Sequence, residues 1–226
     1  MQSNTALQMP LATITLILSG IFFVLYPLIR PFSDESSLQG AAAFASYSWV
    51  LAHSLAIAAF ILLTLGFLGL YIRLKETRVE RHAMVALVLI WIGVGLTLPY
   101  YGAETFGLHA IGQEALRQNS PELLLSLANS VRWQEGIVFI GSGLLLLAAG
   151  TIVFAVAIWK SGWLPKWSGI PLAIGFALYL PQFGTPQEIR VTHGLLIMIA
   201  CSLIAWSISN RSKAPKLQKS DHRDGS

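Results

Sequence analysis

The stretch that decides the fold runs from Gly136 to Trp159 and reads GIVFIGSGLLLLAAGTIVFAVAIW. It contains no Asp, Glu, Lys or Arg, and it is longer than the about 20 apolar residues that a helix needs to cross the hydrocarbon of a bilayer. A β-barrel would instead require strands of about ten residues with alternating polarity. The stretch therefore predicts a transmembrane α-helix.

Five similar uncharged stretches lie on either side of it. The predicted spans are Leu11–Ile29, Trp49–Ile72, Ala83–Ala103, Gly136–Trp159, Trp167–Gln187 and Val191–Asn210. The composition agrees, because 54% of the 226 residues are hydrophobic and 12% are charged, about half the charged fraction of a soluble domain. The sequence predicts an all-α integral membrane protein, a six-transmembrane-helix bundle, with residues 1–210 as a single domain. Soluble and disulfide-scaffold proteins are excluded.

Lysine and arginine are distributed unevenly between the two sides of this bundle. Eleven of them fall in the segments 73–82 and 160–166 and in the tail 211–226. The other side carries four arginines and no lysine: Arg30, Arg117, Arg132 and Arg190. Because cytoplasmic loops are enriched in Lys and Arg, both termini are predicted to be cytoplasmic, and the plasma (cytoplasmic) membrane is the expected location.

The basic tail, residues 211–226, is predicted to be disordered. Its cations would either hold it near anionic lipids or simply determine the topology. The positive charge follows the predicted topology and forms no single basic face, so no nucleic-acid partner is expected.

Two segments at the predicted outer ends of the third and fifth spans resemble each other. Ile92–Gly102 and Ile174–Gly184 are identical at six of eleven positions, with a constant offset of 82 residues. This similarity predicts a parallel internal repeat that relates spans two and three to spans four and five. Each copy contains one proline, Pro99 or Pro181, and we expect matched kinks there. The alternative is that both prolines are ordinary, because membrane helices tolerate them.

Polar side chains gather at the predicted outer ends of the spans. This outer polar layer consists of His53, Tyr100, Tyr101, Glu104, Glu135, Tyr179, Gln182 and His193. Ionisable groups within spans are costly and indicate a functional site. The layer therefore predicts a ligand-binding pocket at the extracytoplasmic end of the bundle. The alternative is that these residues are solvated groups at helix ends.

Part of the layer has the residue types of a metal site. Imidazole and carboxylate ligands for zinc or iron would come from His53, His193, Glu104, Glu135 and His109. The two histidines of the second and sixth spans could also be axial ligands of a haem. Glu104 and His109 are five residues apart, so both point inward only if the helix ends between them.

The segment 113–135 between the third and fourth spans contains a helix signal. Ser120, Pro121 and Glu122 form a typical helix start, with Ser120 as N-cap and Pro121 in the first turn. Apolar residues then recur at helical spacing as far as Val131, which predicts an amphipathic helix at the outer interface. It would either cover the outer polar layer as a lid or merely connect two spans.

Three function classes follow. A small-ligand-binding or transport-type protein is favoured by the repeat and the polar layer. The first alternative is a metal- or haem-dependent membrane enzyme or redox protein that uses His53 and His193. The second is a structural or accessory subunit, a homo-oligomer or the partner of another membrane protein, because glycines such as Gly93 and Gly143 permit close helix contacts. The chain contains no Walker motif, dinucleotide fingerprint, nucleophile elbow or zinc signature.

Overall fold

The computed structural model describes the backbone of residues 3–212 and the side chains of residues 10–210. Within these residues every regular element is a helix. The elements are α1 (Ser3–Ile29), α2 (Leu38–Phe44), α3 (Tyr47–Leu74), α4 (Glu80–Gly102), the π-helix η1 (Ala103–Gly107), α5 (Leu108–Gln118), α6 (Pro121–Trp133), α7 (Glu135–Ser161), the 3₁₀-helix η2 (Lys166–Gly169), α8 (Ile170–Ala177), the 3₁₀-helix η3 (Pro181–Gly184) and α9 (Gln187–Ser212). The predicted tail, 211–226, lies outside the residues whose side chains are described.

Five helical runs are long and apolar enough to cross a membrane. They are Pro10–Ile29, Tyr47–Leu74, Glu80–Gln118, Glu135–Ser161 and Gln187–Asn210. They contain the first, second, third, fourth and sixth predicted spans. The third is longer than predicted, because the helix does not end at Ala103 but continues through η1 and α5 for 39 residues in all.

The fifth predicted span, Trp167–Gln187, is not a continuous helix, and this part of the prediction is wrong. Its α-helical part, α8, has only eight residues and is therefore about 12 Å long. Pro181 lacks the N–H that a continuing helix would use, and its ring would press on the carbonyl of Ala177, where α8 ends. Pro186 then favours the extended backbone of Thr185, which has φ −108° and ψ 158°.

The two prolines of the predicted repeat therefore have different surroundings. Pro99 lies inside α4, which stays α-helical to Gly102, whereas Pro181 begins η3. The prediction of matched kinks is wrong, because Pro99 lies in the interior of a helix and Pro181 lies at a helix break.

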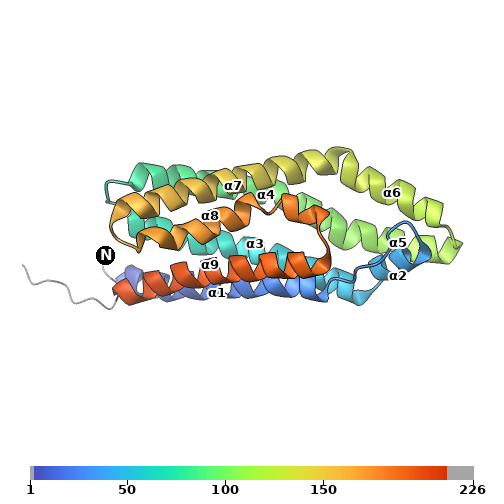
Figure 1. Cartoon of the computed structure of the whole chain (residues 1–226), viewed down its shortest axis with the longest axis horizontal. Coiled ribbons are helices and arrows are strands. Elements are labelled where there is room, and N and C mark those ends of the chain that lie inside the picture. The colour runs from blue at the N-terminus through green and yellow to red at the C-terminus, as the bar shows by residue number, and fades with distance from the viewer. Residues whose placement is uncertain (1–2, 213–226) are drawn as a thin grey trace, which may run out of the picture.

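The helices close into a ring in the order α1, α3, α4, α7, α8 and α9, with α9 packed against α1 (Figure 1). Because α8 is short, the ring is complete at one end and interrupted at the other. The N-terminal end of α1 and the C-terminal end of α9 lie together at the complete end (Figure 1).

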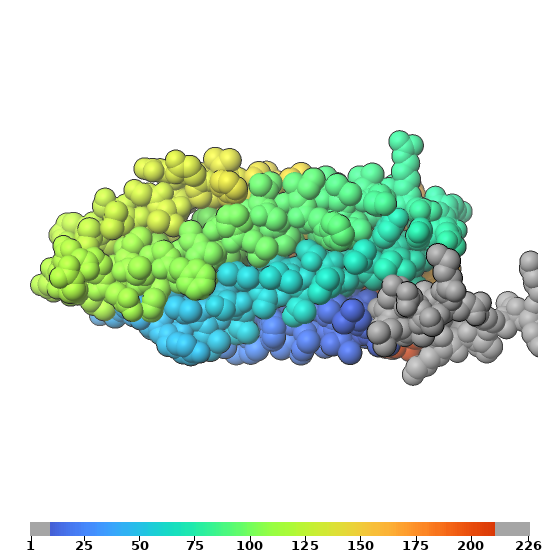
Figure 2. Space-filling view, turned by 180° about the vertical axis from the view of Figure 1, so that it is seen from behind, coloured from blue at the N-terminus to red at the C-terminus, as the bar shows by residue number. Residues whose placement is uncertain are grey.

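A helical cap extends beyond the interrupted end. The cap consists of α2, α5 and α6, and from behind it forms the end of the molecule opposite the described ends of α1 and α9 (Figure 2). Its small core contains Phe44, Leu108, Ala115 and Leu124, together with Trp49 from the start of α3. Ser120 accepts a hydrogen bond from the backbone N–H of Leu123, so the predicted helix start is confirmed. The helix lies on α5 and α2.

Candidate functional site

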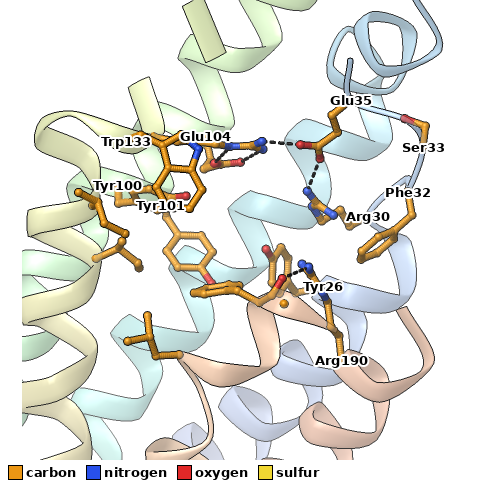
Figure 3. Close-up of a pocket in the computed structure, with 16 residues that line it drawn as sticks. Tyr26, Arg30, Phe32, Ser33, Glu35, Tyr100, Tyr101, Glu104, Trp133 and Arg190 are labelled. Atoms are coloured by element: carbon orange, nitrogen blue, oxygen red, sulfur yellow. Dashed lines mark hydrogen bonds and ion pairs between the residues drawn. The ribbon is translucent and has the colours of Figure 1, made fainter. Parts of the chain in front are cut away.

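A cavity of about 620 Å³ lies where the ring is interrupted. The walls come from the end of α1, the α4–η1 junction, the start of α7, η3, the start of α9 and the last turn of α6 (Figure 3). Its lining contains Tyr26, Arg30, Phe32, Ser33, Glu35, Tyr100, Tyr101, Glu104, Arg132, Trp133, Ile137, Ile140, Leu180, Phe183, Gly184 and Arg190. The cavity reaches the surface at Ser33, Trp133 and Gly184, which are exposed.

The π-helix η1 positions Glu104. A π-turn inserts one extra residue into a helix and occurs often at functional sites. The Thr105 hydroxyl donates to the Tyr101 carbonyl at 2.6 Å, and the indole N–H of Trp49 donates to the Glu104 carbonyl at 2.7 Å. These side chains provide partners for carbonyls next to the irregular turn, and the Glu104 side chain is buried at the cavity wall.

Arg132 connects the cap to the bundle through two carboxylates. Its Nε and Nη2 donate to the two carboxylate oxygens of Glu104 at 2.6 and 3.1 Å, which is the bidentate geometry of a strong ion pair. Its Nη1 donates to Glu35, and Glu35 accepts from Nη2 of Arg30 at 2.9 Å. Burial alone would lower the pKa of Arg132, but the carboxylates of Glu104 and Glu35 raise that pKa above its ordinary value.

His53 lies behind Glu104 and is almost completely buried. Its Nδ1 donates to the Trp49 carbonyl at 2.8 Å, and because a carbonyl only accepts, this bond assigns a proton to Nδ1. Its Nε2 is 3.5 Å from a carboxylate oxygen of Glu104. His53 is therefore in contact with the charged network without itself lining the cavity.

Buried tyrosines form the floor of the cavity. The hydroxyls of Tyr101 and Tyr179 are hydrogen-bonded at 3.0 Å. The ring of Tyr26 packs edge-on against His53 and Tyr101, with centroids 5.3 and 5.7 Å away. Figure 3 shows Tyr26 and Tyr101 below Glu35 and Glu104.

The structure brings together part of the predicted outer polar layer. Tyr100, Tyr101 and Glu104 line the cavity, while His53 and Tyr179 contact these lining residues. Gln182 and His193 lie on the far side of Tyr179, around a separate small void of about 10 Å³. Glu135 is exposed at the start of α7 and is not part of the lining.

Of the predicted metal ligands, His53 and Glu104 are in contact, while His193, His109 and Glu135 lie elsewhere. Nε2 of His193 donates to the Gly175 carbonyl at 2.7 Å, and Nδ1 of His109 donates to the Phe44 carbonyl in the cap at 2.9 Å. Among the described residues, no group of three His, Cys, Asp or Glu side chains could hold a metal ion. His53 and His193 contact different members of the Tyr101–Tyr179 pair, and each has a ring nitrogen bonded to a backbone carbonyl. The geometry therefore does not support the predicted zinc, iron or haem site.

Sequence reasoning missed most of the charged lining. Arg30, Arg132 and Arg190 are three of the four basic residues on the predicted outer side, and the charge bias alone gives them no role there. Arginine forms bidentate bonds and is the usual choice for buried ion pairs. The presence of arginines and the absence of lysines on the predicted outer side therefore indicate buried ion pairs there. Glu35 lies between two predicted spans, and nothing in its immediate sequence indicated a partner.

The chain matches no family model, no curated protein and no solved structure.

Proposed function

We propose that the chain is a polytopic membrane protein that binds a small ligand in the cavity and is of the ligand-binding or transport type. The cavity itself is the observation that carries this proposal. Its volume is in the range of small-molecule sites, which combine apolar walls with a few placed polar groups. Trp133, Ile140 and Phe183 supply apolar wall, and the Glu35–Arg132–Glu104 network supplies the polar groups.

We further propose six passes through the plasma membrane, with the segment from η2 to η3 as the fifth. Its contacts with α7 and α9 support this pass, because they fill the place of a sixth ring member. Irregular backbone at membrane depth is tolerated where protein or a water-filled cavity surrounds it. The Lys and Arg bias supports cytoplasmic termini, and the cavity would then open on the extracytoplasmic side.

Filling the cavity tests ligand binding. A Cβ added at Gly184 meets no atom within 4 Å, so Gly184→Phe would extend a ring from the cavity lining without a backbone clash. Gly95→Phe is the matched control, because a Cβ at exposed Gly95 in α4 also meets no atom within 4 Å and Gly95 is outside the lining.

The measurement is mass spectrometry of small molecules extracted from each purified protein. We expect a compound that is enriched with the wild type and with Gly95→Phe, and at least about tenfold depleted with Gly184→Phe. Identical extracts from all three proteins would contradict the proposal.

A further inference from the structure

The charged groups of the cavity do not balance. Three arginines and two glutamates line it, which leaves a formal excess of one positive charge. Arg132 contacts both carboxylates. Arg190 forms no ion pair with any described residue. The excess charge therefore lies on the side of the cavity that faces α1 and α9.

Arg30 is a buried cation with unused hydrogen-bond donors. Only 8% of the residue is exposed, and its guanidinium carbon lies 4.5 Å from the ring centroid of Phe32 and 4.6 Å from that of Trp49. One nitrogen donates to Glu35. Its Nε has no hydrogen-bond partner among the described residues. A buried donor without a partner is costly, and in an arginine that lines a cavity it indicates an absent acceptor.

Arg190 approaches the same region from α9. Its Nε donates to the Thr185 carbonyl at 2.9 Å, and one Nη donates to the Phe183 carbonyl. Its guanidinium carbon lies 5.2 Å from the centroid of Phe32, so Arg190 and Arg30 share this aromatic neighbour. Figure 3 shows both side chains turned toward the same part of the cavity. Two cations that converge in this way repel each other unless an anion lies between them.

We infer that Arg30 and Arg190 bind the anionic group, a carboxylate or a phosphate, of a ligand whose apolar part lies against Trp133, Ile140 and Phe183. This inference rests on the proposed function and names its ligand class: a small amphiphilic anion. Guanidinium groups bind carboxylate and phosphate through paired N–H donors. The anion could belong to a free organic acid or to the headgroup of an anionic lipid.

The test compares two probes of the same shape in phosphatidylcholine nanodiscs. The probes are 4-bromobenzoate, which is an anion, and 4-bromobenzamide, which is neutral. Bromine quenches indole fluorescence, and Trp133 in the lining is the reporter, with Trp133→Phe identifying its share of the signal. We expect saturable quenching by both probes and binding of the benzoate about tenfold tighter or more, as expected for charge-assisted hydrogen bonds.

Arginine variants then locate the anion. Arg190→Gln should weaken benzoate binding about tenfold and leave benzamide binding unchanged, which also shows that the variant is folded. Arg190→Lys retains the charge but loses the planar guanidinium, so its affinity for benzoate should lie between those of the wild type and Arg190→Gln. Arg117→Gln, a substitution at an exposed arginine of α5 outside the lining, should change neither affinity.

The outcomes separate the two proposals. Equal binding of both probes, or an Arg190→Gln protein that keeps the benzoate preference, overturns the anion site and leaves the ligand-binding cavity intact. Failure of both probes to quench Trp133 overturns both proposals. Phosphatidylglycerol in the nanodisc should compete with the benzoate if the anion belongs to a lipid headgroup and should have no effect if it belongs to a free acid.

Discussion

At the scale of single residues, the ion pair between Arg132 and Glu104 links the cap to the bundle. Its two hydrogen bonds join α6 to the π-turn, and side-chain exposure is only 17% for Arg132 and 6% for Glu104. Removing charges from water is costly, so a buried pair is a weak source of stability. Removal of one partner alone destabilises the fold strongly, because the other charge then remains buried without full compensation.

We therefore expect Glu104→Gln to lower the free energy of unfolding by about 3 kcal/mol, measured by denaturation in mixed micelles. The double variant Glu104→Gln/Arg132→Gln should be less destabilised than the sum of the single variants, since no charge is then orphaned. Glu114→Gln, which breaks an exposed ion pair with Arg117 on α5, is the control and should have no measurable effect. Equal stability of Glu104→Gln and the wild type would refute this role.

At the level of elements, α4 and α7 pack with a close backbone contact at Gly93. A Cβ at Gly93 would be 2.7 Å from the carbonyl oxygen of Gly143 and 2.7 Å from the backbone nitrogen of Leu147. Only glycine permits this approach, because both obstacles are backbone atoms that cannot turn aside. Small residues at such crossings are typical of membrane helices, which gain from close packing.

Gly93→Leu should push α4 and α7 apart and destabilise the protein by about 2 kcal/mol or more. Gly95→Leu is the matched control two residues further along the same helix, where a Cβ meets no atom within 4 Å; it should change stability by less than about 0.5 kcal/mol. Thermal unfolding of both variants in detergent checks the difference. If Gly93→Leu and Gly95→Leu unfold at the same temperature, the close contact does not stabilise the fold.

At the scale of the whole molecule, an incomplete ring creates the cavity. Five long helices form most of the ring, and α8 leaves one end of it open between α7 and α9. The charged network and the cap both lie at this end (Figures 1 and 3). The complete end carries the basic segment 73–82 and the described ends of α1 and α9.

Single cysteines test the orientation of this arrangement. Cys201 is the only cysteine and is buried, so Cys201→Ala is a suitable background. Ser33→Cys at the cavity opening should react with a membrane-impermeant maleimide on intact cells, whereas Lys75→Cys in the 73–82 segment should react only after permeabilisation. The reverse pattern would show that the cavity faces the cytoplasm.

The sequence by itself determined the features that depend on neighbouring residues. The length and polarity of an uncharged run are local, so five of the six predicted spans correspond to long apolar helices. The hydrogen bond by which Ser120 begins α6 as its N-cap is equally local. Three members of the outer polar layer, Tyr100, Tyr101 and Glu104, line the cavity because they share one stretch of helix.

Only the tertiary structure decided which distant residues meet. The pairing of Arg132 with both Glu104 and Glu35 depends on how α6 folds back over the π-helix η1, and no local pattern encodes that path. The prediction for the fifth span failed because its hydropathy is that of a span, while its prolines prevent a continuous helix. Hydropathy reports whether a segment tolerates lipid, but the position of a helix break and the partners of its neighbours depend on packing across the ring.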